Sequence, residues 1–221
     1  EEHLAVALAI GREATKRCDD AQSITTGVLH AAILPTFRQI RTKQDPLEGR
    51  FVPSCPVRLG LLAVARGHDP AWDEEGAADS LRIVARLAEL APHIREREDE
   101  GIEGLMELHR LVGKRCDDLD HARFEEGSEH FLAYCFEFVN GRTIMHGERV
   151  ALGVLIMSTL QGNGPARARG IVRDAGVRHT PDELGITWVE IDAALRELPA
   201  FVAREDLWVS VANDLVVDDR T

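Results

Sequence analysis

Residues 148–160 read ERVALGVLIMSTL, and after their first turn they are apolar on nearly every face of a helix. A surface helix carries a single apolar stripe, so this pattern predicts a helix that is buried on all sides. A helix that crosses a bilayer needs an apolar run of about 18 residues or more. The chain contains no such run, so we expect a buried core helix and no membrane span.

Helical periodicity continues on the N-terminal side of this segment. Apolar residues recur every three or four positions over residues 75–91 and again over residues 101–117, as expected for amphipathic helices. Ser128 stands where an N-cap residue would, ahead of a helix over residues 129–139. These three segments predict helices that pack against the buried one.

The C-terminal side shows start signals for further helices. Thr187 and Glu190 form a capping-box pattern that opens a helix running to about Leu198. Pro181, directly behind Thr180, indicates another short helix. Alternating strand patterns are almost absent, and even Leu207–Val211 is interpreted as helix. The sequence therefore predicts an all-α fold.

The first 70 residues are less regular. Residues 1–18 and 23–40 are helix candidates, whereas residues 42–56 contain three prolines and a glycine and are expected to form a loop. We expect residues 1–221 to form a single helical domain, in which 1–70 is an N-terminal segment and 71–221 is the helical core.

The charge balance excludes some classes of partner. The chain has 221 residues, with 26 Lys and Arg against 38 Asp and Glu, and a formal net charge of −12. A chain this acidic is repelled by phosphate backbones and anionic lipid, so neither nucleic acid nor a membrane surface is expected as a partner. The four cysteines form no C-x-x-C pair, and no signal peptide precedes them. We expect reduced thiols and a cytoplasmic location.

Several catalytic and nucleotide-binding motifs are missing from the sequence. It has no G-x-G-x-x-G and no G-x-x-x-x-G-K-[ST], and so no dinucleotide or nucleoside triphosphate site of its own is predicted. It also lacks a G-x-S-x-G nucleophile elbow and an H-E-x-x-H zinc helix. None of these common motifs therefore identifies a catalytic or binding site in this sequence.

Two histidines stand out by their position. His130 is expected one turn into a helix, and His146 lies just before the buried helix, 146 − 130 = 16 residues later. This spacing allows a helix, a turn and a return, which would bring the two imidazoles together. Such a pair is able to bind a divalent metal if a third ligand joins it. Two partly buried, hydrogen-bonded structural histidines remain the alternative.

The segments around these histidines resemble the iron-containing alcohol dehydrogenase and dehydroquinate synthase-like superfamily. Glu125–His130 contains Gly-Ser-Glu-His, and His146–Gly153 begins with His-Gly-Glu-x-Val. The glycerol-1-phosphate dehydrogenase branch has both segments in this order, and each supplies one metal-binding histidine. The resemblance covers roughly residues 70–165. It implies that His130 and His146 are metal ligands.

The resemblance also implies a fold, cofactors and a substrate class. In that family an all-helical C-terminal half binds the metal, and a Rossmann-like N-terminal domain binds NAD(P). We therefore expect a zinc or iron ion that polarises a substrate oxygen, and a polyol or sugar phosphate as substrate. About 70 residues precede the good match, too few for the nucleotide domain, and the chain begins at Glu1 without Met. That domain is expected to be removed from this chain or supplied by another one.

The third ligand of the family is an upstream carboxylate. The family's usual distance, counted back from Trp72, points to Glu48 within the expected loop, with Asp45 as a substitute. The alternative is that both are ordinary solvated carboxylates. Two imidazoles without a carboxylate would bind a metal poorly.

Two alternative functions remain open at this point. In the dehydroquinate synthase-like branch the same scaffold closes a sugar phosphate into a carbocycle while NAD is recycled. In the other alternative, a helical domain that has lost its nucleotide half acts as a non-catalytic binding or scaffold subunit. A homo-oligomer is possible in each case.

The sequence also predicts positions or roles for four further side chains. Glu129 is expected to point away from His130 into solvent, and His109 to lie at the edge of the core. Tyr134 lies one helical turn after His130, where it would line a cleft or pack. Glu148 is expected either to interact with a helix dipole or to support a ligand.

Overall fold

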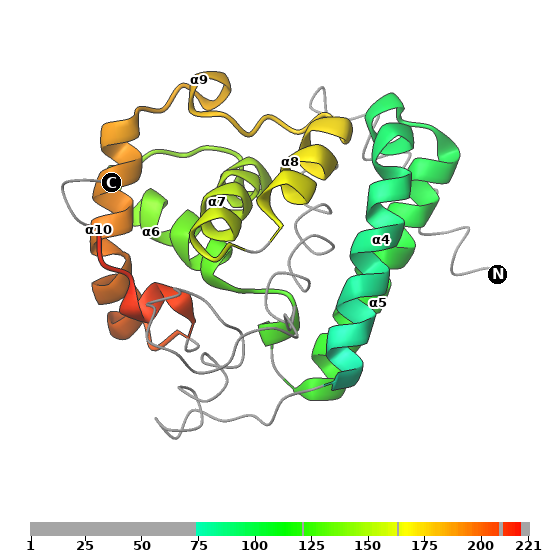
Figure 1. Ribbon diagram of the computed structural model, residues 1–221, viewed down its shortest axis with the longest axis horizontal. Helices are drawn as coiled ribbons and strands as arrows, with labels where there is room; N and C mark the ends of the chain where they lie inside the picture. The colour runs from blue at the N-terminus through cyan, green and yellow to red at the C-terminus, as the bar shows by residue number, and fades with distance from the viewer. Residues whose placement is uncertain (1–73, 121, 163, 208–209, 218–221) are drawn as a thin grey trace.

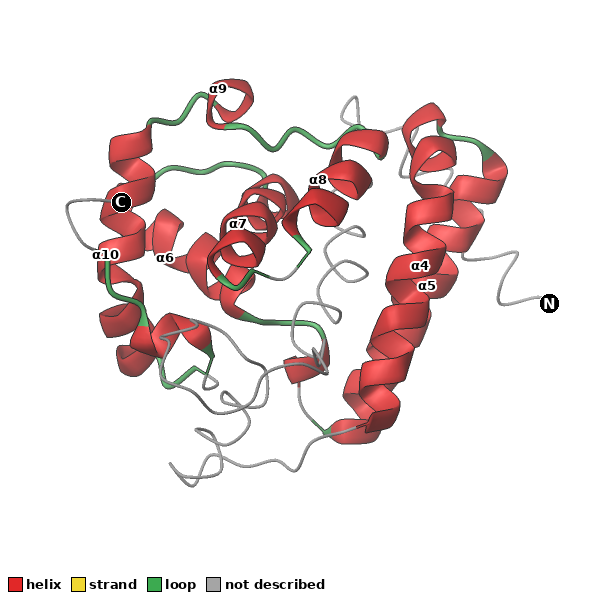
Figure 2. Cartoon of the chain, in the orientation of Figure 1, coloured by secondary structure: helices red, strands yellow, loops and turns green. Residues whose placement is uncertain are grey.

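The computed structural model describes residues 74–120, 122–162, 164–207 and 210–217. Within these ranges the chain forms seven α-helices and two short 3₁₀ helices, with no strand (Figures 1 and 2). The predicted all-α fold is confirmed for this part of the chain. The expected helices before residue 41 and the loop at 42–56 lie outside the described residues. Among the described helices, none has the length and apolarity required to cross a bilayer.

Helices α4 (Glu74–Glu96) and α5 (Asp99–Leu119) form an antiparallel pair at one edge of the molecule (Figure 1). They correspond to the periodic segments at 75–91 and 101–117, each longer than predicted. Gly101 permits the close packing at the turn, because a Cβ there would overlap the backbone of His93 and Ile94. Helix α5 contacts the 3₁₀ helix η2 (Ala122–Phe124), and α4 contacts α8 (Pro165–Asp174).

Helices α6 (Ser128–Asn140) and α7 (His146–Leu160) lie at the centre and pack against each other. Ser128 is the first helical residue rather than the N-cap, which is Gly127. The predicted capping role is wrong because the Ser128 hydroxyl instead accepts a hydrogen bond from Gln161 at 2.9 Å. That bond joins the start of α6 to the end of α7.

Helix α7 is buried on opposite sides, as its sequence predicts. Val150, Ala151 and Val154 belong to an apolar cluster shared with α4, α5 and α8 (Pro165–Asp174). Leu152 and Met157 belong to a second cluster, shared with α6 and α10 (Trp188–Arg204). Because α7 contributes to both clusters, it joins the two halves of the core.

Both predicted helix starts near the C-terminus are confirmed, and the structure has a capping box at each of them. Thr180 and Glu183 cap the single turn α9 (Pro181–Leu184), and Thr187 and Glu190 cap α10, which runs six residues past the predicted end at Leu198. The helix expected over 207–211 is wrong. Leu207 and Ser210 are not helical, and the Ser210 side chain caps the 3₁₀ helix η3 (Val211–Asp214) instead.

Candidate metal centre

The structure brings His130 and His146 together. His130 lies in the first turn of α6 and is fully buried, and His146 is the first residue of α7 and half-buried. Loop 141–145 returns the chain from the end of α6 to the level of its first two turns, and the ring centroids lie 5.7 Å apart. The predicted proximity of the two imidazoles is therefore confirmed.

Tyr134 completes a triangle of rings with the two histidines. Its ring stacks on His146 with a centroid separation of 5.6 Å and lies tilted to His130 at 5.8 Å. The Tyr134 hydroxyl donates a hydrogen bond to Glu126 at 3.0 Å. Burial and the Glu126 charge raise the pKa of this phenol well above its usual value. A neutral phenol is a poor metal ligand, so Tyr134 is better suited to pack the rings than to bind a metal.

The electrostatic setting keeps the His146 imidazole neutral. Burial is the largest cause of a lowered pKa, and the proximity of His130 and Arg149 adds to it, so that the pKa of His146 falls to about 4. Both histidine ligands of a metal must present an unprotonated nitrogen. At neutral pH His146 therefore needs to release no proton before it binds a cation.

Glu129 is buried, and the expectation that it points into solvent is wrong. Only 4% of the residue is exposed, and its Oε1 lies 3.3 Å from the Nδ1 atom of His130. Helix α7 crosses this turn of α6, since a Cβ on Gly153 would lie 2.5 Å from the Glu129 carbonyl oxygen. The tertiary crossing covers the face that the helical pattern alone assigned to solvent.

The two imidazoles fit half of a metal-binding donor set. Two imidazoles on one tetrahedral zinc place their ring centroids about 5–6 Å apart, given zinc–nitrogen bonds near 2 Å. The separation of the His130 and His146 rings lies in that range. Within the described residues, no group of three or more His, Cys, Asp or Glu side chains is placed to hold a metal ion. Glu48 and Asp45, the expected sources of a third ligand, lie outside the described residues.

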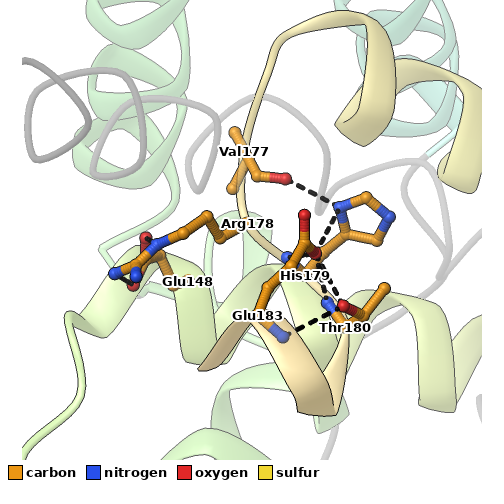
Figure 3. Close-up of polar contacts among 6 residues, drawn as sticks. All are labelled: Glu148, Val177, Arg178, His179, Thr180 and Glu183. Carbon is orange, nitrogen blue, oxygen red and sulfur yellow. Dashed lines mark hydrogen bonds and ion pairs between the residues drawn. The ribbon is translucent and has the colours of Figure 1, made fainter. Parts of the chain in front are cut away.

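Glu148 follows His146 by two residues and is held by an arginine from the loop after α8. Its carboxylate is 1% exposed and accepts hydrogen bonds from Arg178 at 2.6 and 2.8 Å (Figure 3). Figure 3 shows the Arg178 side chain extending toward α7, whereas the His179 ring extends in the other direction. The contact with Arg178 anchors the start of α7, the end of the helix that carries His146.

The segment that carries Arg178 is itself tightly fixed. The Nδ1 atom of His179 lies 2.7 Å from the Val177 carbonyl oxygen, and Glu183 accepts hydrogen bonds from the backbone N–H groups of His179 and Thr180 (Figure 3). The Thr180 hydroxyl also donates a hydrogen bond to Glu183. The three hydrogen bonds lower the pKa of Glu183 to about 2, and the bond from the Thr180 hydroxyl has the largest effect. The sequence predicted the helix start at Pro181, whereas the contact between Arg178 and Glu148, 30 positions apart, has no local signal.

His109 takes no part in this region. It was expected at the edge of the core, but its side chain is exposed on α5. The helix is amphipathic with Leu105, Leu108 and Val112 buried, and His109 lies just outside that stripe. This exposure makes His109 a suitable control position for experiments on His130 and His146.

Several glycerol-1-phosphate dehydrogenases are similar to part of this chain. The chain is 28% identical over 124 residues to a glycerol-1-phosphate dehydrogenase (NAD(P)+) of Aeropyrum pernix, a match that covers 56% of this chain and 35% of the relative. The enzyme of Pyrococcus horikoshii is 29% identical over 107 residues, covering 48% of this chain and 30% of the relative. That of Pyrobaculum islandicum is 30% identical over 140 residues, covering 62% and 39%.

The chain is a distant, partial homologue of the glycerol-1-phosphate dehydrogenases. The resemblance inferred from the two histidine segments is thereby confirmed. The chain spans roughly a third of the length of these relatives, from 30% to 39%. No family model matches the chain.

Proposed function

We propose that this chain is the metal-binding helical part of an NAD(P)-dependent dehydrogenase that acts on a polyol phosphate. The single observation that carries the proposal is the approach of His130 and His146 to 5.7 Å at the adjoining ends of α6 and α7. The homology to glycerol-1-phosphate dehydrogenases supports the choice of reaction class.

The roles of the side chains follow from their positions. His130 and His146 bind a zinc or iron ion through neutral imidazole nitrogens, and the low pKa of His146 favours this state. Tyr134 packs against both rings and fixes the angle between them. Glu148 and Arg178 hold the first turn of α7, and with it His146, against the loop after α8.

When bound, the metal supplies Lewis-acid polarisation of a substrate hydroxyl or carbonyl oxygen. A nicotinamide cofactor held by a nucleotide-binding domain would supply hydride chemistry at the carbon beside that oxygen, and the helical part would orient the substrate. In this proposal the nucleotide-binding domain and a third, carboxylate ligand come from outside the described residues. Glu48 remains the candidate for that ligand.

Metal binding by the full chain tests the proposal directly. We expect the wild-type protein to retain zinc or iron after purification and to bind Co²⁺ with visible d–d absorption bands. His130→Ala and His146→Ala should each weaken Co²⁺ binding at least about tenfold, since each removes one ligand. The measurement is titration with Co²⁺ against a competing chelator at pH 7.5, together with elemental analysis.

His109→Ala is the matched control, because it removes an exposed histidine from α5. It should bind Co²⁺ as the wild type does. If the wild-type chain binds neither Zn²⁺, Fe²⁺ nor Co²⁺, or if His109→Ala weakens binding as much as the site variants do, the proposal is wrong.

A non-catalytic scaffold subunit is the second candidate. It is favoured by one observation, the lack of a third metal ligand among residues 74–120, 122–162, 164–207 and 210–217. In that case the two histidines would remain as packing residues around Tyr134. The same titration separates the candidates, since a scaffold has no need to bind Co²⁺ through His130 and His146.

A further inference from the structure

Glu129 is a buried carboxylate that the proposed roles do not yet use. Its side chain is 5% exposed, and the ring of His130 beside it is fully buried. A buried carboxylate is costly unless hydrogen bonds or opposite charges compensate it. Within the part of the chain that the structure describes, the Oε1 atom of Glu129 lies 3.3 Å from the Nδ1 atom of His130. The side chain therefore lies in the interior with its carboxylate directed at this imidazole.

Two glycines lie directly against Glu129. Gly127 borders it, because a Cβ at Gly127 would lie 2.5 and 2.6 Å from the two carboxylate oxygens of Glu129. A Cβ at Gly153 of α7 would likewise lie 2.5 Å from the backbone carbonyl oxygen of Glu129. Any larger residue at these two positions would displace Glu129, so the two glycines and the carboxylate form one packed unit.

A simpler explanation is that Glu129 only interacts with the positive, N-terminal end of the α6 helix dipole. An acidic residue in the first turn of a helix is stabilised there without contacting any side chain. Such a residue is normally solvated, however, and nothing in a dipole interaction requires burial. The burial and the contact with His130 point to a more specific role.

We propose that Glu129 is a positioning residue that fixes the tautomer and the orientation of His130. An ionised carboxylate only accepts hydrogen bonds, so the Nδ1 atom of His130 must carry the proton in this contact. The Nε2 atom then carries the lone pair, which makes it the nitrogen that can bind a cation. This inference rests on the proposed metal-binding function, because it assigns the support of one of its ligands.

The arrangement has a chemical consequence for metal affinity. Metal-binding imidazoles commonly donate their second N–H to a carboxylate, and loss of this partner weakens metal binding by about 10–100-fold. Here the carboxylate and the imidazole are consecutive residues on one helix, and α7 holds both in place. His130 is thereby preorganised before any cation arrives.

The test combines two variants of the full chain with two measurements. Glu129→Gln keeps an oxygen that accepts from Nδ1, whereas Glu129→Leu removes it. Two-bond ¹H–¹⁵N correlation spectra of the metal-free protein report the His130 tautomer, and Co²⁺ titration reports affinity. We expect the Nδ1–H tautomer in the wild type and in Glu129→Gln, and its loss in Glu129→Leu together with a fall in Co²⁺ affinity of about 10–100-fold.

Glu183→Gln is the matched control, since it alters another hydrogen-bonded carboxylate, one that caps α9 and contacts neither site histidine. It should leave the His130 tautomer unchanged, and the circular dichroism of each variant shows whether the helices persist. Retention of both tautomer and affinity in Glu129→Leu overturns the inference. So does a Glu129→Gln protein that keeps the tautomer but binds Co²⁺ as poorly as His130→Ala, because Glu129 would then be a ligand.

The two proposals fail in different ways. If the wild type binds no metal, the proposed function is wrong, and the tautomer spectra still decide whether Glu129 positions His130. If the wild type binds metal through His130 and His146 but the tautomer does not depend on Glu129, only the positioning role is wrong.

Discussion

Gly153 lies where α7 crosses the first turn of α6, directly against the backbone of Glu129. The contact concerns main-chain atoms, which cannot rotate away as a side chain can. His130 follows Glu129 in sequence, so the separation of the two helices at this point also sets the position of its imidazole. Because Gly153 has no Cβ, the helices that carry His130 and His146 can approach each other closely at this point.

We predict that Gly153→Ala destabilises the protein, since the added Cβ would lie 2.5 Å from the Glu129 carbonyl oxygen. Overpacking of this kind costs about 1–3 kcal/mol in the free energy of unfolding. Gly170→Ala on α8 is the control, because a Cβ there meets nothing within 4 Å. It should stabilise the protein by about 0.5–1 kcal/mol through helix propensity. Urea unfolding measures both changes, and a Gly153→Ala protein as stable as the wild type would contradict the assigned crossing.

Errors of the sequence-based predictions also arise at the scale of single residues. Glu129 was assigned to solvent because consecutive residues on a helix point to different faces. That rule describes an isolated helix, and the crossing by α7 covers both faces of this turn. His130 and His146 were found because their flanking residues form recognisable segments, whereas Arg178 carries no such signal.

At the scale of elements, local signals in the sequence were sufficient wherever short-range contacts define the structure. The capping boxes at Thr180–Glu183 and Thr187–Glu190 involve residues three positions apart, and both are present. The apolar pattern of residues 148–160 predicted a buried helix, and α7 is one. The end of α10 was missed because tertiary packing of Phe201 and Val202 into the second cluster extends that helix beyond Leu198.

The capping box of α9 makes stability depend on pH. The pKa of Glu183 is about 2 in the folded state, below its ordinary value of 4.5, because Thr180 and His179 donate hydrogen bonds to the carboxylate. Its stabilising contribution is therefore present above the ordinary pKa and is lost as the pH falls toward 2. We predict that Glu183→Gln is less stable than the wild type at pH 7 and that the difference shrinks between pH 5 and pH 2.

Urea unfolding at several pH values measures this difference. Glu205→Gln is the control, since this exposed residue pairs with the adjacent Arg204 at a helix end. A stability difference for Glu183→Gln that stays constant from pH 7 to pH 2 would show that the capping carboxylate is not the group responsible.

At the scale of the whole molecule, contacts distant in sequence join the elements. Arg178 and Glu148 connect the loop after α8 to the start of α7. We predict that Arg178→Ala destabilises the protein by about 2–3 kcal/mol. Breaking a fully buried pair costs about 3–5 kcal/mol, and the half-exposed guanidinium lowers that figure.

Arg173→Ala provides the control for this prediction. Arg173 is exposed and pairs with its neighbour Asp174, so its removal should change the free energy of unfolding by less than about 0.5 kcal/mol. Thermal and urea unfolding report the two variants side by side. Equal stabilities of Arg178→Ala and the wild type would show that Glu148 does not depend on this partner.

Helix α7 contributes side chains to both apolar clusters, so neither cluster can loosen without exposing part of it. A segment placed in this way opens only when the entire fold opens, whereas helices at the margin are free to fray. His146, the first residue of α7, is therefore anchored to the last part of the molecule to melt. A binding centre built on that residue would disappear abruptly at the melting temperature, without a preceding gradual decline.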